Sequence, residues 1–277
     1  MEIVARRLAP ALAGEVVESV LAPGINAVKT FDPPLHDLAG ARFTDVTRRG
    51  KVLLFAVESE RHGPLTLLIH LMSAGRMQLL GKRATLRDKT SRLLIRLPED
   101  RELRVREFGT RQAAWVKLLR PADLEQEESL ITLGPEAWPD PPPFGPLLAA
   151  PRPLHTLLRD QRVIAGIGRT WVDDILHAAR LSPFKRGDDL SEAEGLRATT
   201  IAELGRVIEH YEAQVALPLP EKFPKPVRVH GLQGKPCPSC GGTLEAVFYE
   251  DYVMTYCPAC QTEGRVLKDR RLSRLLK

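Results

Sequence analysis

The sequence contains no apolar run near the about 20 residues that a membrane-spanning helix needs. Its first segment, Met1 to Leu12, carries Glu2, Arg6 and Arg7 within an apolar pattern and lacks the long apolar stretch of a secretion signal. No internal repeat is evident either. Without such apolar stretches, we expect a soluble, intracellular and cytoplasmic protein rather than a membrane-spanning or secreted one.

Charge of one sign is in slight excess. The net charge of +5 and the pI of about 9.1 weakly favour a nucleic-acid partner. The excess is most evident in the tail Gly264–Lys277, which holds six basic residues and the single acidic residue Asp269. Such a tail is either a solvated end or a phosphate-facing segment, and a metal site next to it favours the second interpretation.

The chain of 277 residues is long enough for two domains. Apolar residues at helical spacing predict a leading helix over residues 2–12. Closely spaced short strands with turn signals between them then predict a β-sandwich. These strands are expected at Val16–Leu21, Ala41–Val46, Val52–Val57, Leu65–Leu71, Leu93–Leu97, Leu103–Val105 and Ala113–Leu119.

Helical patterns dominate after a proline-rich segment, residues 137–153, which we interpret as a linker. Helices are expected at Leu154–Arg159, at Thr170–Arg180, and from the capping pair Ser191 and Glu194 to about Val215. The predicted domains are a sandwich over 1–136, a helical domain over 154–230, a zinc finger over 231–263 and a basic tail over 264–277. The fold class is thus α+β.

All four cysteines fall in one pattern. Cys237 and Cys240 form one Cys-x-x-Cys pair, and Cys257 and Cys260 form a second pair after 16 intervening residues. This spacing is typical of a zinc ribbon, in which four thiolates close the tetrahedron of a structural ion. Two disulfides or a redox dithiol are the alternatives. Since the chain has no other cysteine and no export signal, we expect one structural Zn²⁺.

Several local motifs, in this order, resemble one family. They are Arg48–Lys51 before a strand, Ile69–Leu71 followed by Gly75 and Arg76, Leu133–Glu136, Asp160–Gly168, and the finger segments Gly234–Cys237 and Tyr256–Gln261. The chain thereby resembles the formamidopyrimidine-DNA glycosylase / endonuclease VIII family along nearly its whole length. The resemblance implies a helix–two-turns–helix motif in the helical domain and a zinc-ribbon hairpin at the C-terminal end.

The resemblance also implies roles for single residues. Lys51 and His70 would contact phosphates, with Lys51 also a possible amine nucleophile, and Phe108 would be the wedge inserted into the duplex. Gly168 and its neighbours would bring backbone amides to a phosphate. The remaining DNA-binding residues implied are Arg76, Arg169, which replaces the family asparagine, and Tyr252, which replaces the finger arginine.

The sequence departs from the family at its start. Family members begin with PELPEVE, whose proline amine attacks the sugar and whose glutamates move protons, whereas this chain matches from the valine onward, with Glu2 at the last glutamate. We therefore expect the reading frame to continue upstream of Met1; the alternative is a protein that lacks this nucleophile. Glu107 stands where the family has an arginine facing the orphaned base, a place where it could only read a cytosine amino group.

These observations together predict a hydrolase and lyase: a DNA glycosylase with AP-lyase activity, acting in base-excision repair on oxidised or abasic double-stranded DNA. We expect a nucleoid-associated monomer. The alternative is a catalytically silent binder of damaged or distorted DNA on the same scaffold. A zinc-ribbon interaction module without DNA chemistry fits the sandwich and helical motifs least well.

Overall fold

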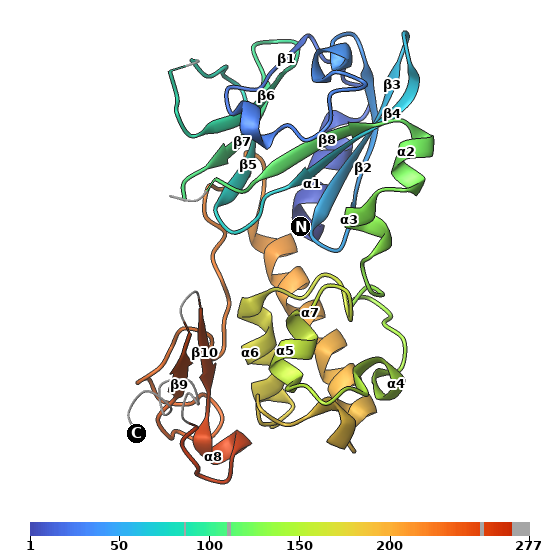
Figure 1. The fold of residues 1–277 in the computed structure, drawn as a ribbon. Helices are drawn as coiled ribbons and strands as arrows, with labels where there is room; N and C mark the ends of the chain where they lie inside the picture. The colour runs from blue at the N-terminus through green and yellow to red at the C-terminus, as the bar shows by residue number, and fades with distance from the viewer. Residues whose placement is uncertain (86, 110–111, 250–251, 268–277) are drawn as a thin grey trace, which may run out of the picture. The chain divides into compact units, whose positions relative to one another are not determined.

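The structure, a computed structural model, describes residues 1–85, 87–109, 112–249 and 252–267. The chain divides into two compact units (Figure 1). Unit 1 comprises Met1–Thr132 and His210–Pro224, and unit 2 comprises Leu133–Glu209 and Lys225–Lys277. Across the described ranges, no helix combines the length and the apolar character needed to cross a membrane.

Unit 1 is built on two antiparallel four-stranded sheets, with strand orders β1-β6-β7-β5 and β2-β3-β4-β8. Figure 1 shows the second set of strands side by side. The strands are β1 (Ser19–Leu21), β2 (Arg42–Arg49), β3 (Val52–Ser59), β4 (Gly63–His70), β5 (Gly75–Leu80), β6 (Ser91–Arg96), β7 (Glu102–Glu107) and β8 (Trp115–Leu119). The predicted fold class is therefore confirmed.

The predicted strands differ from the observed ones mainly at their ends. The run predicted to begin at Val16 is a strand only over Ser19–Leu21, and β5 was not predicted at all. In β5, buried Gly75, Met77 and Leu79 alternate with half-buried residues. Its glycine and polar residues hide this period-2 pattern in the sequence, because only two of the buried positions carry a large apolar side chain.

The helices of unit 1 cover the sheets. Helix α1 (Glu2–Leu12) buries Ile3, Val4, Leu8 and Leu12, which recur at helical spacing, and packs on β2. This confirms the predicted leading helix. The shorter helices are η1 (Ile25–Ala27), η2 (Leu35–Leu38), α2 (Pro121–Glu125) and α3 (Glu128–Ile131).

Unit 2 is a helical cluster followed by a small hairpin. Its elements are α4 (Phe144–Leu148), α5 (Leu154–Arg159), α6 (Arg169–Ala178), η3 (Gly187–Asp189), α7 (Ala193–Gln214), β9 (Glu245–Phe248), β10 (Val253–Tyr256) and α8 (Pro258–Gln261). The last turn and a half of α7 belongs to unit 1 by the division above. The three predicted helices are present, with ends shifted by at most two residues.

The proline-rich segment 137–153 is not an extended connection. Ala137, Phe144 and Leu148 are buried in the core of the helical cluster, and α4 forms inside the segment. Prolines end helices and remove backbone donors, but they do not prevent the apolar residues between them from packing. Residues 210–224, assigned from sequence to the helical domain, pack with unit 1 instead.

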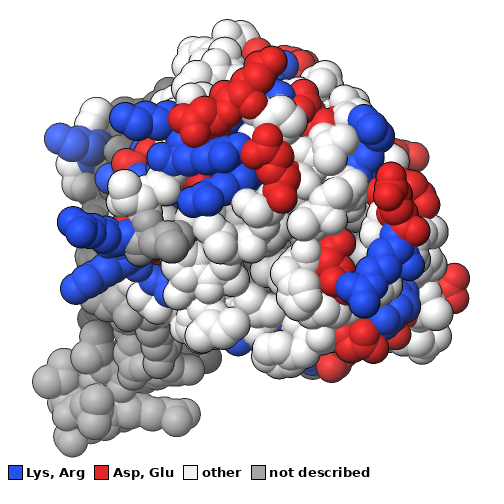
Figure 2. Space-filling view, turned by 90° about the horizontal axis from the view of Figure 1, so that it is seen from above, with Lys and Arg blue, Asp and Glu red and all other residues white. Residues whose placement is uncertain are grey.

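Basic and acidic side chains lie interspersed on the surface. Figure 2 shows a face on which they form small mixed groups rather than one broad basic area. Ion pairs in unit 1 account for part of this mixing, among them Arg101 with Glu15 and Arg120 with Asp32, each at 2.7 Å. A nucleic-acid site must therefore be located from individual clusters rather than from overall charge.

Candidate metal centre and nucleic-acid interface

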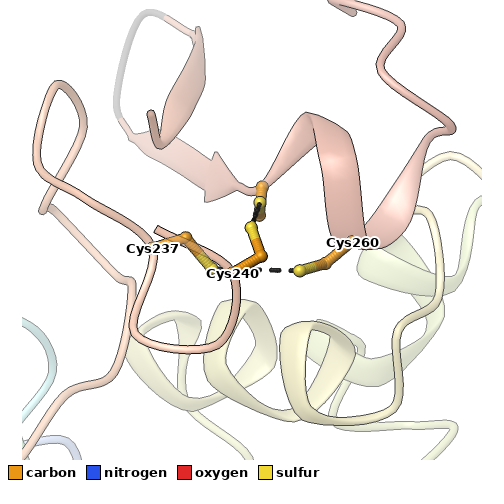
Figure 3. Close-up of side chains that lie close together, drawn as sticks. Cys237, Cys240 and Cys260 are labelled. Carbon is orange, nitrogen blue, oxygen red and sulfur yellow. Dashed lines mark hydrogen bonds between the residues drawn. The ribbon is translucent and has the colours of Figure 1, made fainter. Parts of the chain in front are cut away.

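Four cysteine sulfurs converge at the hairpin of unit 2. Cys237 and Cys240 lie in the turn before β9, Cys257 follows β10, and Cys260 lies on α8. All four sulfurs lie within 4.8 Å of one another, with those of Cys240 and Cys257 3.5 Å apart (Figure 3). Thiolates around a tetrahedral zinc ion stand about 3.8 Å apart. The cluster thus fits one four-coordinate metal ion.

Hydrogen bonds favour the ionised form of two of these thiols. The backbone amide of Gly242 and the neighbouring thiols lower the pKa of Cys240 to about 7. Burial opposes ionisation of Cys237, but hydrogen bonds from the Ser239 amide and from His177 leave its pKa lowered. Burial instead raises the pKa of Cys257 and of Cys260. The contacts in the cluster thus favour the thiolate form, which metals bind, at Cys237 and Cys240.

His177 contacts the cysteine cluster from helix α6. Its side chain is buried, and its Nε2 lies 3.2 Å from Sγ of Cys237. Its Nδ1 is buried without a hydrogen-bond partner in the described part of the chain. The sequence analysis missed this residue because a single histidine on an apolar helix face carries no spacing signal toward distant cysteines.

Two adjacent buried carboxylates join the hairpin to α6. Asp174 accepts hydrogen bonds from the consecutive backbone amides of residues 228–230, at 2.7–3.1 Å. Asp173 accepts from His230 Nδ1 at 2.7 Å and from the Thr255 amide at 2.9 Å. The metal hairpin is therefore fixed to α6 by polar contacts as well as by packing. The sequence signal that could have revealed this is a pair of carboxylates between apolar residues of the helix, Val172 before them and Ile175 after them.

Two of the sequence motifs pack against each other before α6. A Cβ on Gly134 would lie 2.4 Å from the carbonyl oxygen of Val163, so only glycine fits there. The Gln161 side chain donates to the Ile167 carbonyl oxygen and accepts from the Gly166 amide, both at 3.0 Å. These contacts fix the turn that leads into α6.

Gly168 is the N-cap residue of α6, with φ −94°. A Cβ at this position would meet nothing closer than Trp171 at 4.0 Å, so neither space nor backbone conformation demands glycine. Apart from its chain neighbours, no other described residue fills the space beside Gly168. Arg169, the next residue, has its guanidinium carbon 6.0 Å from the ring centre of Tyr252. The structure therefore brings these two departures from the family pattern together.

Lys51 and His70 lie close together in unit 1. Lys51 follows Gly50, whose φ of +55° makes the tight turn between β2 and β3. His70 ends β4, and its ring stacks on Trp115 at 5.5 Å. The His70 Nδ1 accepts a hydrogen bond from the Met72 amide at 3.0 Å.

Burial, together with the charge of Lys51, lowers the pKa of His70 to about 4. The imidazole is therefore neutral at pH 7. Because its Nδ1 is the acceptor, its proton lies on Nε2. His70 is thus a hydrogen-bond donor at neutral pH and not a cation.

The start of α1 adds further charged groups to this region. The Glu2 carboxylate accepts from Nε of Arg48 at 2.6 Å and from Nε of Arg6 at 2.7 Å. Burial and the charge of Arg48 lower the pKa of the Met1 amino group to about 6, with Lys51 contributing in the same direction.

Phe108 lies on the surface and not in the core. Its side chain is 46% exposed, its amide donates to the carbonyl oxygen of Ala74 at 3.3 Å, and the guanidinium carbon of Arg106 lies 4.6 Å from its ring centre. Met72, in the same β4–β5 connection as Ala74, is 48% exposed and has φ +50°. Both side chains are therefore accessible to a partner.

Arg76 and Glu107 occupy the neighbouring strands β5 and β7. Arg76 donates to the Gly75 carbonyl oxygen at 2.7 Å and lies opposite Arg106 in the sheet. Glu107 is 3% exposed and accepts from the amides of Ala113 and Ala114, at 2.8 and 3.0 Å. Glu107 therefore binds the backbone before β8 and is buried, which corrects the sequence-based expectation that it faces the orphaned base.

The basic tail lies mostly outside the described residues. Of its six basic side chains only Arg265 falls within them, and it pairs with Glu263 at 2.8 Å. The phosphate-facing interpretation of Lys268, Arg270, Arg271, Arg274 and Lys277 therefore stays a prediction.

The fold and these clusters define an α+β protein with a sandwich unit and a second unit that combines a helical cluster with a four-cysteine hairpin. A family described as the formamidopyrimidine-DNA glycosylase N-terminal domain matches residues 1–112. The formamidopyrimidine-DNA glycosylase of Thermus thermophilus is 31% identical over 95% of this chain and 97% of its own length. The chain therefore belongs to the formamidopyrimidine-DNA glycosylase family.

Two further comparisons agree with this assignment. An uncharacterised formamidopyrimidine-DNA glycosylase-like protein of Mycobacterium tuberculosis is 42% identical over 126 residues, which cover 45% of this chain and 80% of that protein. The Lactococcus lactis Fpg in complex with abasic-site DNA superposes with a TM-score of 0.81, covering 94% of this chain and 98% of that one at 23% identity. At that identity the likeness establishes the fold.

Proposed function

We propose that this protein is a DNA glycosylase with AP-lyase activity that acts on oxidised or abasic double-stranded DNA in base-excision repair. The observation that carries the proposal is the match to the Thermus thermophilus glycosylase along 95% of the chain. The Lactococcus lactis relative was solved with abasic-site DNA. The clusters described above supply groups suited to the same kind of partner.

Removing a damaged base requires taking it out of the stack, which costs a few kcal/mol. The exposed side chains of Phe108 and Met72 are suited to fill the resulting gap. The charge of Lys51 and the neutral Nε2–H of His70 can bind phosphates, and Arg76 and the opening at Gly168 add further contacts. Each of these groups offers an exposed apolar surface, a cation or a hydrogen-bond donor, which is what a bent and unstacked duplex requires.

The chemical step needs an amine that attacks the sugar carbon, releases the base and forms a Schiff base. Two amines are candidates. One is the Nζ of Lys51. The other is the N-terminal amine of a proline, which the reading frame supplies if it continues upstream of Met1.

Borohydride trapping on abasic DNA separates these candidates, because it reduces a Schiff base to a permanent bond. We expect trapping by a chain that carries Pro-Glu-Leu-Pro-Glu ahead of position 1, with valine restored at that position. Lys51→Ala should weaken DNA binding without abolishing this trapping. If Lys51→Ala abolishes trapping instead, Lys51 is the nucleophile. If no form traps or releases a base while all bind damaged DNA, the silent binder is the correct function.

We further propose that the four-cysteine cluster holds one structural Zn²⁺. Four thiolates leave no open coordination position, so the ion would organise the hairpin and take no part in the reaction. Cys240→Ser should lose stoichiometric zinc by elemental analysis, and with it DNA affinity, because metal binding and folding of the hairpin are coupled. Full zinc content in that variant would contradict the four-cysteine site.

The expected partner is duplex DNA bound by a single copy of the chain. Sedimentation with a lesion-containing duplex tests this: a one-to-one complex supports a monomer, and a complex with two protein chains contradicts it.

A further inference from the structure

The ring of Tyr252 is the centre of a cluster in unit 2. It stacks on Tyr249 with centroids 4.3 Å apart and planes at 11°, and on His155 at 5.8 Å and 14°. The guanidinium carbon of Arg159 lies 3.8 Å from the same ring centre, and that of Arg169 lies 6.0 Å away. Two arginines therefore lie against the ring of one tyrosine, one from the end of α5 and one from the start of α6.

Polar contacts hold His155, one member of this cluster, in place. His155 is buried and its Nε2 lies 3.1 Å from the Asp173 carboxylate, which also binds His230 and the Thr255 amide. Asp160, which follows Arg159 in the chain, is paired with Arg152 at 2.9 Å. Arg159 is thus positioned by the tyrosine ring, while the carboxylate next to it in sequence is engaged by another arginine.

We propose that Arg159 and Arg169, supported on the ring of Tyr252, bind one phosphate group of a DNA backbone. This inference rests on the proposed function as a DNA-binding repair enzyme and adds to it a residue, Arg159, that sequence motifs do not single out. In this chain the charge that the family resemblance places at position 252 is supplied by Arg159 instead.

The chemistry of the cluster favours a phosphate over a stacked base. The ring of Tyr252 already contacts Tyr249, His155 and Arg159, so little of its surface is left for a nucleobase. Guanidinium groups present planar forks of N–H donors that match phosphate oxygens. Stacking on an aromatic ring restricts such a side chain in advance, so less entropy is lost when an anion binds.

Salt-dependent binding tests the inference. Fluorescence anisotropy between 50 and 200 mM salt would use an abasic-analogue duplex and an undamaged duplex of the same sequence. Arg159→Met should weaken binding to both duplexes about tenfold. The slope of log affinity against log salt should become shallower, by at most about 0.9, the value for one phosphate contact, because Arg169 remains on the same phosphate. The matched control is Arg197→Met on α7, because Arg197 pairs with Asp140 at 2.7 Å; its slope should not change.

Exchanging the charge between positions 159 and 252 gives a second, independent test. Tyr252→Arg alone should not increase affinity, because it removes the supporting ring and crowds a third cation against two others. Arg159→Leu combined with Tyr252→Arg should recover most of the salt slope that Arg159→Leu loses. Zinc content, measured for each variant, confirms that the hairpin is folded.

An Arg159→Met variant that folds and binds both duplexes with unchanged affinity and slope would overturn the inference, as would a gain in affinity from Tyr252→Arg alone. The proposed function fails through a different result, namely an unmodified protein that neither processes nor prefers lesion-containing DNA. Non-specific duplex binding still reports on Arg159 in that case. The two failures are therefore distinguishable.

Discussion

His177→Phe should loosen the metal centre without removing any of its four thiolates. The substitution keeps a ring of similar size in a buried site of α6 and removes the Nε2 that lies 3.2 Å from Sγ of Cys237. The thiolate would then lose one hydrogen bond, while Cys237 would keep the longer contact from the Ser239 amide at 3.4 Å.

The expected magnitude follows from the charge on the acceptor. A hydrogen bond to a charged group contributes about 1.5–3 kcal/mol, and loss of an outer-shell partner typically lowers metal affinity about 10- to 100-fold. The two estimates agree. Some of the loss will be offset, because the variant also removes the buried Nδ1 that has no hydrogen-bond partner among the described residues. We therefore expect a weakening nearer the lower end, about tenfold.

Competition with a chromophoric zinc chelator measures this affinity directly. Cobalt substitution provides a second readout, because the sulfur-to-cobalt charge-transfer band responds to hydrogen bonding at the thiolate. His177→Gln, which can still donate an N–H, should lie between the unmodified protein and His177→Phe. The matched control is His210→Phe, because His210 belongs to unit 1 and the cysteine cluster belongs to unit 2. Unchanged zinc affinity and an unchanged cobalt spectrum in His177→Phe would refute this role of His177.

Three further predictions follow from the site geometry. Phe108→Ala should weaken binding to a lesion-containing duplex more than to single strands, where no bases have to be unstacked. The control is Phe31→Ala, which also removes an exposed phenylalanine. Equal losses of affinity for both substrates in Phe108→Ala would count against a wedge. Gly134→Ala should lower the thermal midpoint by several degrees, since its Cβ would lie 2.4 Å from a carbonyl oxygen; a variant as stable as the unmodified protein would show that the turn can relax. Because the pKa of His70 is lowered to about 4, the unfolded chain binds a proton between pH 6.5 and about 4 and the folded chain does not. The free energy of unfolding should therefore fall by about 3 kcal/mol as the pH drops through this window. The free energy of unfolding of His70→Asn, measured with urea, should not show this fall. Identical pH profiles of stability for the variant and the unmodified protein would contradict the lowered pKa.

The sequence predicted the parts of the protein whose signals are local. The spacing of Cys237, Cys240, Cys257 and Cys260 was sufficient to predict that the four cysteines lie together, because metal ligation fixes both residue type and separation. The leading helix was equally readable, since its apolar residues repeat along one face.

Contacts between distant segments were not predictable in the same way. Glu107 was expected near a partner but is buried and accepts hydrogen bonds from two backbone amides. Backbone donors carry no sequence signature, so this contact could not be predicted. The meeting of Arg159 with Tyr252, 93 positions further along the chain, depends on how α5 and the hairpin pack. His177 reaches Cys237 for the same reason. Each of these contacts is set by tertiary packing rather than by local pattern.

The most direct test of the central claim is the intact mass of the protein after borohydride treatment with an abasic-site duplex. If the protein is a glycosylase and lyase that works through an amine, the chain carrying Pro-Glu-Leu-Pro-Glu ahead of position 1 gains the mass of a reduced DNA adduct, and peptide mapping places the adduct on its N-terminal amine. The absence of any adduct, on a protein that contains zinc and binds the same duplex, would contradict the enzyme and leave a binder of damaged DNA.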